Sequence, residues 1–352
     1  MPPASTALLL VASLCLLAIV SGNVPFTVEL NETPSEWVHF FSKCVGSGHA
    51  TLALRSDWRQ QLQQCHNDLK VEYVRFHGLL DDDMSTYLPT EPSTKPYSFF
   101  NVDSIFDFLV SIGMKPVVEL SFMPAGLASN ASQTIFHYKG GTSPPSNYSQ
   151  FADFIGDLAL HLVERYGIQE VSTWYFEVWN EPNCGFWSGS QQDYFDLFTV
   201  ISESIAKVDS RLRVGGPVTC QSQWIADFRN LVVNESLHAS FISTHEYPTD
   251  IKPLSRDIMR KVINQTMQEA APFPVLYTET NDGLYFSLNG TEYHDDPYAA
   301  AWAFFNVQDI MPLATSAYSP PLQFLSWWTF SDVSCFLRFT VALHVPIASF
   351  CF

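Results

Sequence analysis

The chain has 352 residues, of which 47% are hydrophobic and 14% are aromatic, and it carries 36 acidic against 18 basic side chains. This composition can fill a sizeable core, and a charged fraction of 15% is too low for a disordered chain. The length suits either one large barrel or two smaller domains. A formal net charge of −18 repels phosphate backbones and anionic lipid headgroups, so we expect no nucleic acid among its partners.

The segment 1–22 predicts a cleaved signal peptide. Its apolar stretch 7–20 is too short to span a bilayer, and the small residues Val20 and Gly22 follow at the spacing of a signal-peptidase site. The segment lacks Lys and Arg, so a buried core helix is the alternative. We therefore expect a protein of the secretory pathway, in the extracellular space or the lysosomal lumen, with no membrane span.

Glycosylation sequons and cysteines agree with this compartment. The Asn-x-Ser/Thr sequons are at Asn31, Asn130, Asn147, Asn234, Asn264 and Asn289. Once Cys15 is removed with the signal peptide, the remaining cysteines are Cys44, Cys65, Cys184, Cys220, Cys335 and Cys351. Their number is even but small for the chain length, and no Cys-x-x-Cys pair occurs. We predict accessory disulfides of open connectivity and no metal site.

Strand-like apolar runs recur along the chain and alternate with segments of helical periodicity. The runs begin near Trp37, Val71, Pro116, Thr173, Leu212, Phe241, Pro274 and Phe324. Apolar residues at 3/4 spacing predict helices over 102–112, 151–166 and 194–208, the first two stopping at Gly113 and Gly167.

Eight runs in this alternation predict parallel strands in an α/β protein, a (β/α)₈ TIM barrel of one domain over 23–332. The segment 139–146 is too short for a linker between domains. The alternative is a doubly wound open sheet, but the glycine pair in 46–49 lacks the third glycine of a nucleotide-binding turn.

Two carboxylates stand at predicted strand ends, where a barrel of this type places its chemistry. Glu181 ends the fourth run and Glu279 ends the seventh, so the two would face each other across the barrel mouth. Glycoside hydrolysis needs such a pair, one acid to protonate the leaving oxygen and one carboxylate on the opposite side of the bond. The alternative for each is a solvated charge or an arginine partner. Glu177 is predicted to be a buried, paired structural acid, and Glu119 is a weaker catalytic candidate.

Seven short motifs resemble glycoside hydrolase family 39, which includes β-xylosidases and α-L-iduronidases. They are CVGSG (44–48), RFHGLLDDD (75–83), FEVWNEPN (176–183) with FW (186–187), VGGP (214–217), STHEY (243–247), YTET (277–280) and WWTFSD (327–332). The likeness covers about Trp37 to Asp332. It implies a retaining mechanism in which Glu181 is the general acid/base and Glu279 the nucleophile.

Further residues are candidates for binding the sugar. Asn180 could hydrogen-bond the 2-hydroxyl, or stabilise a turn instead. Arg75 and His77 share one side of the second run and could point into the mouth, or be satisfied within the core. Trp328 closes the eighth run and could stack on a pyranose, or belong to the core.

A second pair of residues shares one face of the sixth run. His245 and Tyr247 alternate along it, so both could face the mouth. Tyr247 could then orient Glu279 by a hydrogen bond.

The resemblance ends after Asp332. Relatives continue with an eighth helix and a β-sandwich, whereas this chain continues with the apolar segment 333–352. We interpret the segment as the product of a gene-model or splicing error, or of a truncated isoform. An absent eighth helix would expose apolar area at the barrel seam, at a cost of several kcal/mol at about 25 cal/mol per Å².

The motifs predict a retaining exo-glycosidase that needs no cofactor and acts on an oligosaccharide or glycoside. NEPN, FW and TET are closer to the β-xylosidase pattern than to the iduronidase pattern, and no cationic cluster for a uronic acid is evident. Alternatives are an α-L-iduronidase-like lysosomal enzyme and a catalytically silent carbohydrate-binding protein. A metalloenzyme is disfavoured because no HExxH motif occurs. The sugar, the linkage and the oligomeric state stay open.

Overall fold

The computed structural model describes residues 36–89, 95–250, 255–283 and 297–330. The predicted signal peptide, the segment 333–352 and the sequons at Asn31 and Asn289 lie outside the described residues. The described residues from Trp37 onward belong to one compact unit.

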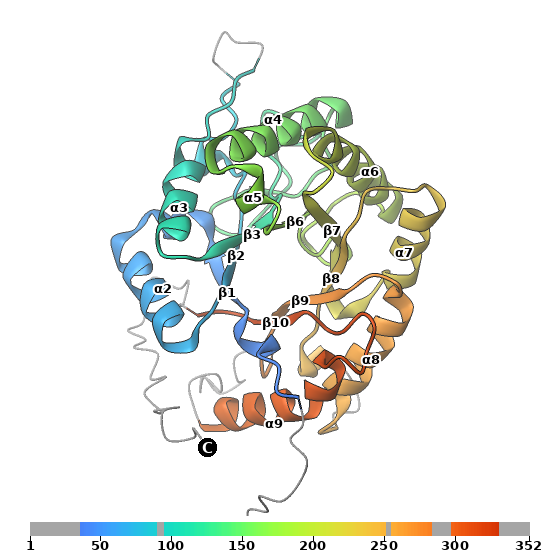
Figure 1. Cartoon of the computed structure of the whole chain (residues 1–352). Helices are drawn as coiled ribbons and strands as arrows, with labels where there is room; N and C mark the ends of the chain where they lie inside the picture. The colour runs from blue at the N-terminus through green and yellow to red at the C-terminus, as the bar shows by residue number, and fades with distance from the viewer. Residues whose placement is uncertain (1–35, 90–94, 251–254, 284–296, 331–352) are drawn as a thin grey trace, which may run out of the picture. The chain divides into compact units, whose positions relative to one another are not determined.

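Eight parallel strands close into a barrel (Figure 1), which confirms the predicted TIM barrel. The strands are β1 (Cys44–His49), β2 (Tyr73–His77), β3 (Lys115–Glu119), β6 (Tyr175–Glu177), β7 (Arg213–Thr219), β8 (Phe241–His245), β9 (Val275–Thr280) and β10 (Phe324–Trp327). Each pairs with its neighbours in this order, and β10 pairs with β1 to close the ring. The open doubly wound sheet is thereby excluded.

Helices follow the strands and form a layer around the barrel (Figure 1). They are α2 (Ser56–Leu69), α3 (Phe100–Ser111), α4 (Tyr148–Tyr166), α5 (Ile168–Val171), α6 (Gln191–Val208), α7 (Ile225–Asn234), α8 (Ile258–Ala270) and α9 (Pro297–Ala314). The three helices predicted from periodicity are confirmed as α3, α4 and α6. Gly113 and Gly167, which follow α3 and α4, both have φ of +81°, a conformation that favours glycine. None of the helices in the described part of the chain is long and apolar enough to cross a membrane.

The first strand begins later than predicted. The apolar run after Trp37 forms a short 3-10 helix, Phe40–Ser42, and the strand covers Cys44–His49 instead. All six residues of this strand are buried although they include two glycines, a serine and a histidine. A strand buried on both faces lacks the alternation of apolar and polar residues. This strand also lacks a continuous apolar run, so neither sequence pattern marks it. The strand begins at Cys44 and ends at His49.

Apolar side chains from the strands fill the barrel near its N-terminal end. This small cluster contains Cys44, Tyr73, Val117, Phe241, Leu276 and Phe324. A larger cluster lies between the strands and the helices and buries, among others, Trp174, Phe106 and Phe198. Because the lower barrel is closed by apolar packing, polar side chains collect at the carboxyl ends of the strands.

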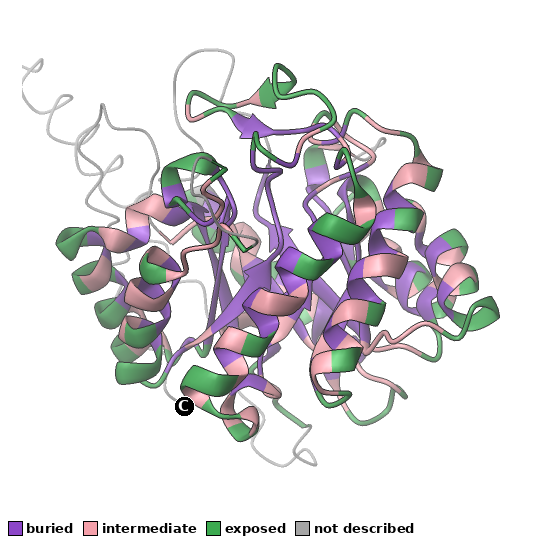
Figure 2. Ribbon diagram, turned by 90° about the horizontal axis from the view of Figure 1, so that it is seen from above, coloured by how far each residue is buried: buried purple, intermediate pink, exposed green. Residues whose placement is uncertain are grey.

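A hairpin in the long connection between β3 and α4 lies at the carboxyl end of the barrel (Figure 2). Its strands are β4 (Thr134–Ile135) and β5 (Gly140–Gly141), which pair antiparallel. Phe136, between them, stacks on His77 at the end of β2, with ring centroids 6.2 Å apart. The hairpin therefore contributes to the wall of the barrel mouth.

We expect Gly46→Ala to displace the Trp328 ring. A Cβ atom on Gly46 would collide with this ring, and overpacking of this kind costs about 1–3 kcal/mol. Thermal unfolding and tryptophan fluorescence would report a lower midpoint and a changed emission. Gly185→Ala is the matched control, since a Cβ there meets no atom within 4 Å. Equal effects of the two substitutions would contradict the close packing of Trp328 on β1.

Candidate active site

Arg75 of β2 lies at the centre of a buried charge cluster at the barrel mouth. Its Nε donates to Glu177 Oε2 at 2.6 Å and its Nη1 to Glu279 Oε1 at 2.7 Å. Its Nη2 donates to Asn180 Oδ1 at 2.9 Å and lies 2.6 Å from Glu119 Oε2. Burial would lower the pKa of Arg75, but the three carboxylates raise it, so the guanidinium stays charged. The cluster joins β2, β3, β6 and β9, and Glu177 is the buried, paired acid that the sequence predicted.

His77 and Glu119 form a second layer of this cluster. His77 Nδ1 lies 2.8 Å from Glu119 Oε2, and the Ser121 hydroxyl donates to the same carboxylate. Burial alone would lower the pKa of His77 and raise that of Glu119, but their mutual attraction and Arg75 reverse both shifts. The structure therefore places Glu119 as an ionised support for Arg75 and His77, which explains why a carboxylate lies on this strand.

Glu279, the last acidic residue of β9, accepts hydrogen bonds on both carboxylate oxygens. Arg75 donates to Oε1, and the Tyr247 hydroxyl donates to Oε2 at 3.0 Å. The predicted hydrogen bond from Tyr247 is thus present. His77 Nε2 is 3.5 Å from Oε1. These contacts hold the carboxylate in one orientation.

Glu181 lies in the loop after β6, and its surroundings differ from those of Glu279. Its backbone has φ of +44°, and its N–H donates to Val218 O at 2.8 Å. Its Oε1 lies 2.8 Å from His245 Nδ1. Burial raises the pKa of Glu181 to about 7, although His77 and Arg75 act against this shift. A carboxyl group with this pKa can hold a proton near neutral pH.

The two carboxylates approach each other closely. A carboxylate oxygen of Glu181, one of Glu279 and a ring nitrogen of His245 all lie within 4.8 Å of one another. Burial lowers the pKa of His245 to about 4, so the ring is neutral. Retaining glycosidases have carboxyl groups about 5–5.5 Å apart, and inverting ones about 6.5–9.5 Å. The nearest oxygens of Glu181 and Glu279, at most 4.8 Å apart, are closer than either range.

Aromatic rings lie around His77, which is next to Glu279. Trp328 lies 4.6 Å from the His77 ring, and Phe186 lies 5.5 Å from Phe136 of the hairpin. Such faces can pack against the apolar side of a sugar ring. The residues predicted for the site are all joined by direct contacts in the structure: Glu181, Glu279, Asn180, Arg75, His77, His245, Tyr247 and Trp328.

His49 and Tyr138 also belong to the mouth but were missed from the sequence. The two rings stack with centroids 3.7 Å apart, and His49 Nε2 lies 3.1 Å from Asp81 Oδ2. His49 ends β1, so a correct first strand would have identified it by the strand-end criterion. Tyr138 is on the hairpin loop, where no periodic pattern marks it.

Within the described residues, His49, Asp81 and Asp83 also bring together atoms that could bind a metal ion. His49 is hydrogen-bonded to the Thr51 hydroxyl through Nδ1 and to Asp81 through Nε2. Both ring nitrogens therefore have protein partners, and Asp83 Oδ1 lies 3.4 Å from His49 Nε2. The sequence-based prediction that the protein needs no metal or cofactor remains a prediction.

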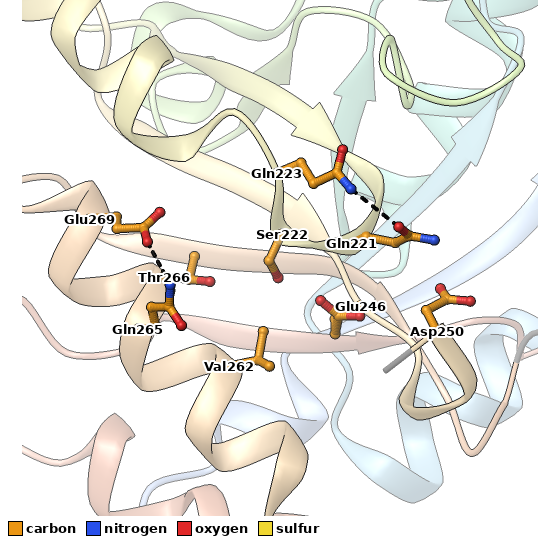
Figure 3. A pocket seen from close by; sticks show the side chains of 9 residues that line it. All are labelled: Gln221, Ser222, Gln223, Glu246, Asp250, Val262, Gln265, Thr266 and Glu269. Carbon is orange, nitrogen blue, oxygen red and sulfur yellow. Dashed lines mark hydrogen bonds between the residues drawn. The ribbon is translucent and has the colours of Figure 1, made fainter. Parts of the chain in front are cut away.

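A polar pocket of about 320 Å³ lies beside the mouth, between the β7–α7 loop, the end of β8 and α8 (Figure 3). It is lined by Gln221, Ser222, Gln223, Glu246, Asp250, Val262, Gln265, Thr266 and Glu269. Burial raises the pKa of Glu246 to about 7, and its Oε1 has no hydrogen-bond partner. His245 ends β8 and Glu246 follows it, but their side chains lie in different places. His245 contacts Glu181, and Glu246 lines the pocket.

The chain was compared with known protein families, curated proteins and solved structures. Residues 25–339 match the model of the glycosyl hydrolases family 39. The chain belongs to this family. The match ends seven residues beyond Asp332, where the resemblance was expected to stop.

Two curated β-xylosidases are similar to this family 39 chain. That of Caldicellulosiruptor saccharolyticus is 45% identical over 308 residues, covering 84% of this chain and 61% of the relative. That of Geobacillus stearothermophilus is 34% identical over 315 residues, covering 82% and 60%. A solved family 39 β-xylosidase of Caulobacter crescentus has a TM-score of 0.75 at 30% identity, covering 85% of this chain and 64% of that one. The chain spans about three fifths of the length of the curated relatives.

We expect the stability of the protein to fall between pH 5 and pH 8 partly because of Glu246. Its pKa rises from 4.5 to about 7 on folding, so the native state holds a proton that the unfolded state has lost. The contribution is complete below pH 4.5 and disappears as the pH rises through 7. It amounts to on the order of 3 kcal/mol at most. Glu246→Gln should therefore flatten the pH dependence of urea unfolding.

Glu235→Gln, a change at an exposed glutamate after α7, is the matched control. It should leave the pH dependence as in the wild type. A wild-type curve that stays parallel to that of Glu246→Gln from pH 5 to pH 8 would contradict the proton held by Glu246.

Proposed function

We propose that this family 39 chain is a retaining glycoside hydrolase that removes a terminal sugar, β-xylosidase-like in specificity, by double displacement. The observation that carries the proposal is the pair Glu181 and Glu279, whose carboxylate oxygens lie within 4.8 Å of each other in different surroundings. One carboxyl group has a pKa of about 7, and the other accepts hydrogen bonds on both oxygens. These are the properties of a general acid and of an oriented nucleophile.

In the first step, a Glu279 oxygen attacks the anomeric carbon while Glu181 gives its proton to the leaving oxygen. The glycosidic bond breaks, and a glycosyl ester on Glu279 forms. In the second step, Glu181 takes a proton from water, and the resulting oxygen nucleophile releases the sugar from Glu279. Glu181 ends the cycle protonated, as it began. Arg75 and Tyr247 hold the Glu279 carboxylate for attack.

Asn180 is placed to bind the sugar. Arg75 Nη2 donates to its Oδ1. The Nδ2 hydrogens of Asn180 are then the donors left for the 2-hydroxyl of the sugar. A hydrogen bond to this hydroxyl strengthens as positive charge develops on the ring. Trp328 and Phe186 supply apolar faces beside it.

A neutral sugar fits the charges of the site better than a uronic acid. A carboxylate on the substrate calls for a cationic partner, but Arg75 is already bonded to three glutamates. The similarity to two β-xylosidases points the same way. The proposed substrate is therefore a β-xyloside.

We also propose that the protein acts in the secretory pathway, outside the cell or in the lysosome. The disulfide between Cys184 and Cys220 supports an oxidising compartment. Asn130 and Asn234, in two of the sequons, are exposed. Secretion from eukaryotic cells, followed by glycosidase treatment and a mass measurement, tests this assignment.

We expect Glu181→Ala to separate substrates by leaving group. Turnover of an alkyl β-xyloside should fall about 10²–10⁴-fold because the leaving oxygen needs the proton. A 2,4-dinitrophenyl β-xyloside needs no proton to leave, so its first step should be spared, and azide should restore its second step. Equal losses on both substrates would argue against the acid role.

Wild-type kcat/KM for the alkyl substrate should fall as the pH rises through about 7, since Glu181 loses its proton there. NMR of the first product should show β-xylose before mutarotation. Glu279→Gln should abolish turnover and leave binding measurable. An α-configured first product, or turnover by Glu279→Gln, would contradict double displacement on Glu279.

A further inference from the structure

A disulfide joins the loop that carries Glu181 to the neighbouring loop. Cys184 follows Glu181 by three residues, and Cys220 follows the end of β7, in the loop that leads to α7. Cys220 is buried and Cys184 is half-buried. The bond therefore links the segments that follow two adjacent barrel strands.

Hydrogen bonds connect the Glu181 loop to the end of β7 and to the loop that follows β7. Glu181 N–H donates to Val218 O at 2.8 Å, and Cys220 N–H donates to Asn183 Oδ1 at 2.9 Å. Asn183 Nδ2 in turn donates to Cys220 O at 3.0 Å and to Gln223 Oε1 at 3.1 Å. The second loop, residues 221–223, also forms one wall of the polar pocket (Figure 3).

Both loops and the last residues of β7 contain non-glycine residues in the left-handed region. The φ values are +44° at Glu181, +55° at Val218, +58° at Gln221 and +50° at Ser222. Side chains disfavour this region, so such a backbone persists only where other contacts hold it. The disulfide and the bonds of Asn183 are contacts of this kind.

The disulfide also lies against the Glu181 carboxyl group itself. A carboxylate oxygen of Glu181 and the sulfur atoms of Cys184 and Cys220 are within 4.8 Å of one another. A sulfur bridge is a weak hydrogen-bonding partner, so it occupies space that water could fill. It therefore contributes to the burial of Glu181.

The other groups that face Glu181 are charged or titratable. They are Arg75 and His77 on β2, Glu119 on β3, His245 on β8, Tyr247 and Asp250 after β8, and Glu279 on β9. None of them is bonded to either cysteine among the described contacts. The hydrogen bonds and ion pairs that hold these partners therefore do not involve the bridge.

We propose that the Cys184–Cys220 disulfide positions Glu181 and keeps water from its carboxyl group, so that opening the bridge weakens general acid catalysis more than it weakens folding of the barrel. The inference rests on the proposed function of Glu181. Both cysteines are positioning residues, since they act through Glu181.

The test compares the wild type, Cys184→Ala/Cys220→Ala and the wild type reduced with a dithiol. In the reduction, the dithiol supplies two electrons and two protons, the S–S bond becomes two thiols, and the reagent closes to its own cyclic disulfide. We expect kcat/KM for an alkyl β-xyloside to fall about ten-fold or more, and that for the dinitrophenyl β-xyloside to fall less than about three-fold. The pH at which activity declines should move below 7 by on the order of half a unit, as water reaches Glu181.

Cys65→Ser is the matched control, because Cys65 is a half-buried cysteine of α2 without a disulfide. It should keep the wild-type ratio between the two substrates. Circular dichroism and the melting temperature identify any variant that fails to fold, in which case the reduced wild type decides. Equal losses of kcat/KM on both substrates overturn the inference. An unchanged ratio between the two substrates, with an unchanged pH at which activity declines, overturns it as well.

Failure of the proposed function would look different, since the wild type would then release no aryl alcohol. The inference is still testable in that case. Glutamate labelled with ¹³C at the side-chain carboxyl, with Glu181→Gln for assignment, gives the pKa of Glu181 directly. A lower pKa in the double variant supports the inference, and an unchanged one overturns it.

Discussion

The buried guanidinium of Arg75 is the constraint on which the rest of the site depends. It bonds carboxylates from β3, β6 and β9 and the amide of Asn180, so one side chain fixes groups from across the barrel. Breaking a buried ion pair by removing one partner costs about 3–5 kcal/mol, because the other charge stays behind. The cluster therefore fixes the orientation of Glu279 and Asn180 while Glu119 and Glu177 balance the charge.

Glu181 and Glu279 are alike in chemistry and differ only in surroundings. Glu279 lies on a strand and accepts hydrogen bonds from an arginine and a tyrosine. Glu181 lies on a loop beside a neutral histidine and a disulfide, and burial raises its pKa. The proposed acid and the proposed nucleophile are thus identical side chains, one desolvated and the other held by hydrogen bonds.

The walls of the site come from less regular parts of the chain. The β4–β5 hairpin brings Phe136 and Tyr138 to the mouth, and Gly46 leaves room for the Trp328 ring. The loop after β6 is held by the loop after β7 through the bonds of Asn183 and a disulfide. Glu279, the proposed nucleophile, is therefore on a strand end, and Glu181, the proposed acid, is on a cross-linked loop.

The sequence by itself predicted the barrel, seven of its eight strands, three helices and the two glutamates. This was possible because strands buried on both faces form continuous apolar runs, and the polar residues that follow them mark one end of the barrel. The first strand was not predicted correctly, because Cys44–His49 has neither an alternating pattern nor an apolar run. His49 was missed for the same reason.

Only the tertiary structure decided how Glu119, His245 and the disulfide are used. Their partners come from other strands or loops, and closure of the barrel alone sets the distances between them. The opposite pKa shifts of Glu119, which is lowered, and Glu181, which is raised, arise in the same way. Burial and neighbouring charge depend on what lies nearby in space, and a linear sequence does not contain that information.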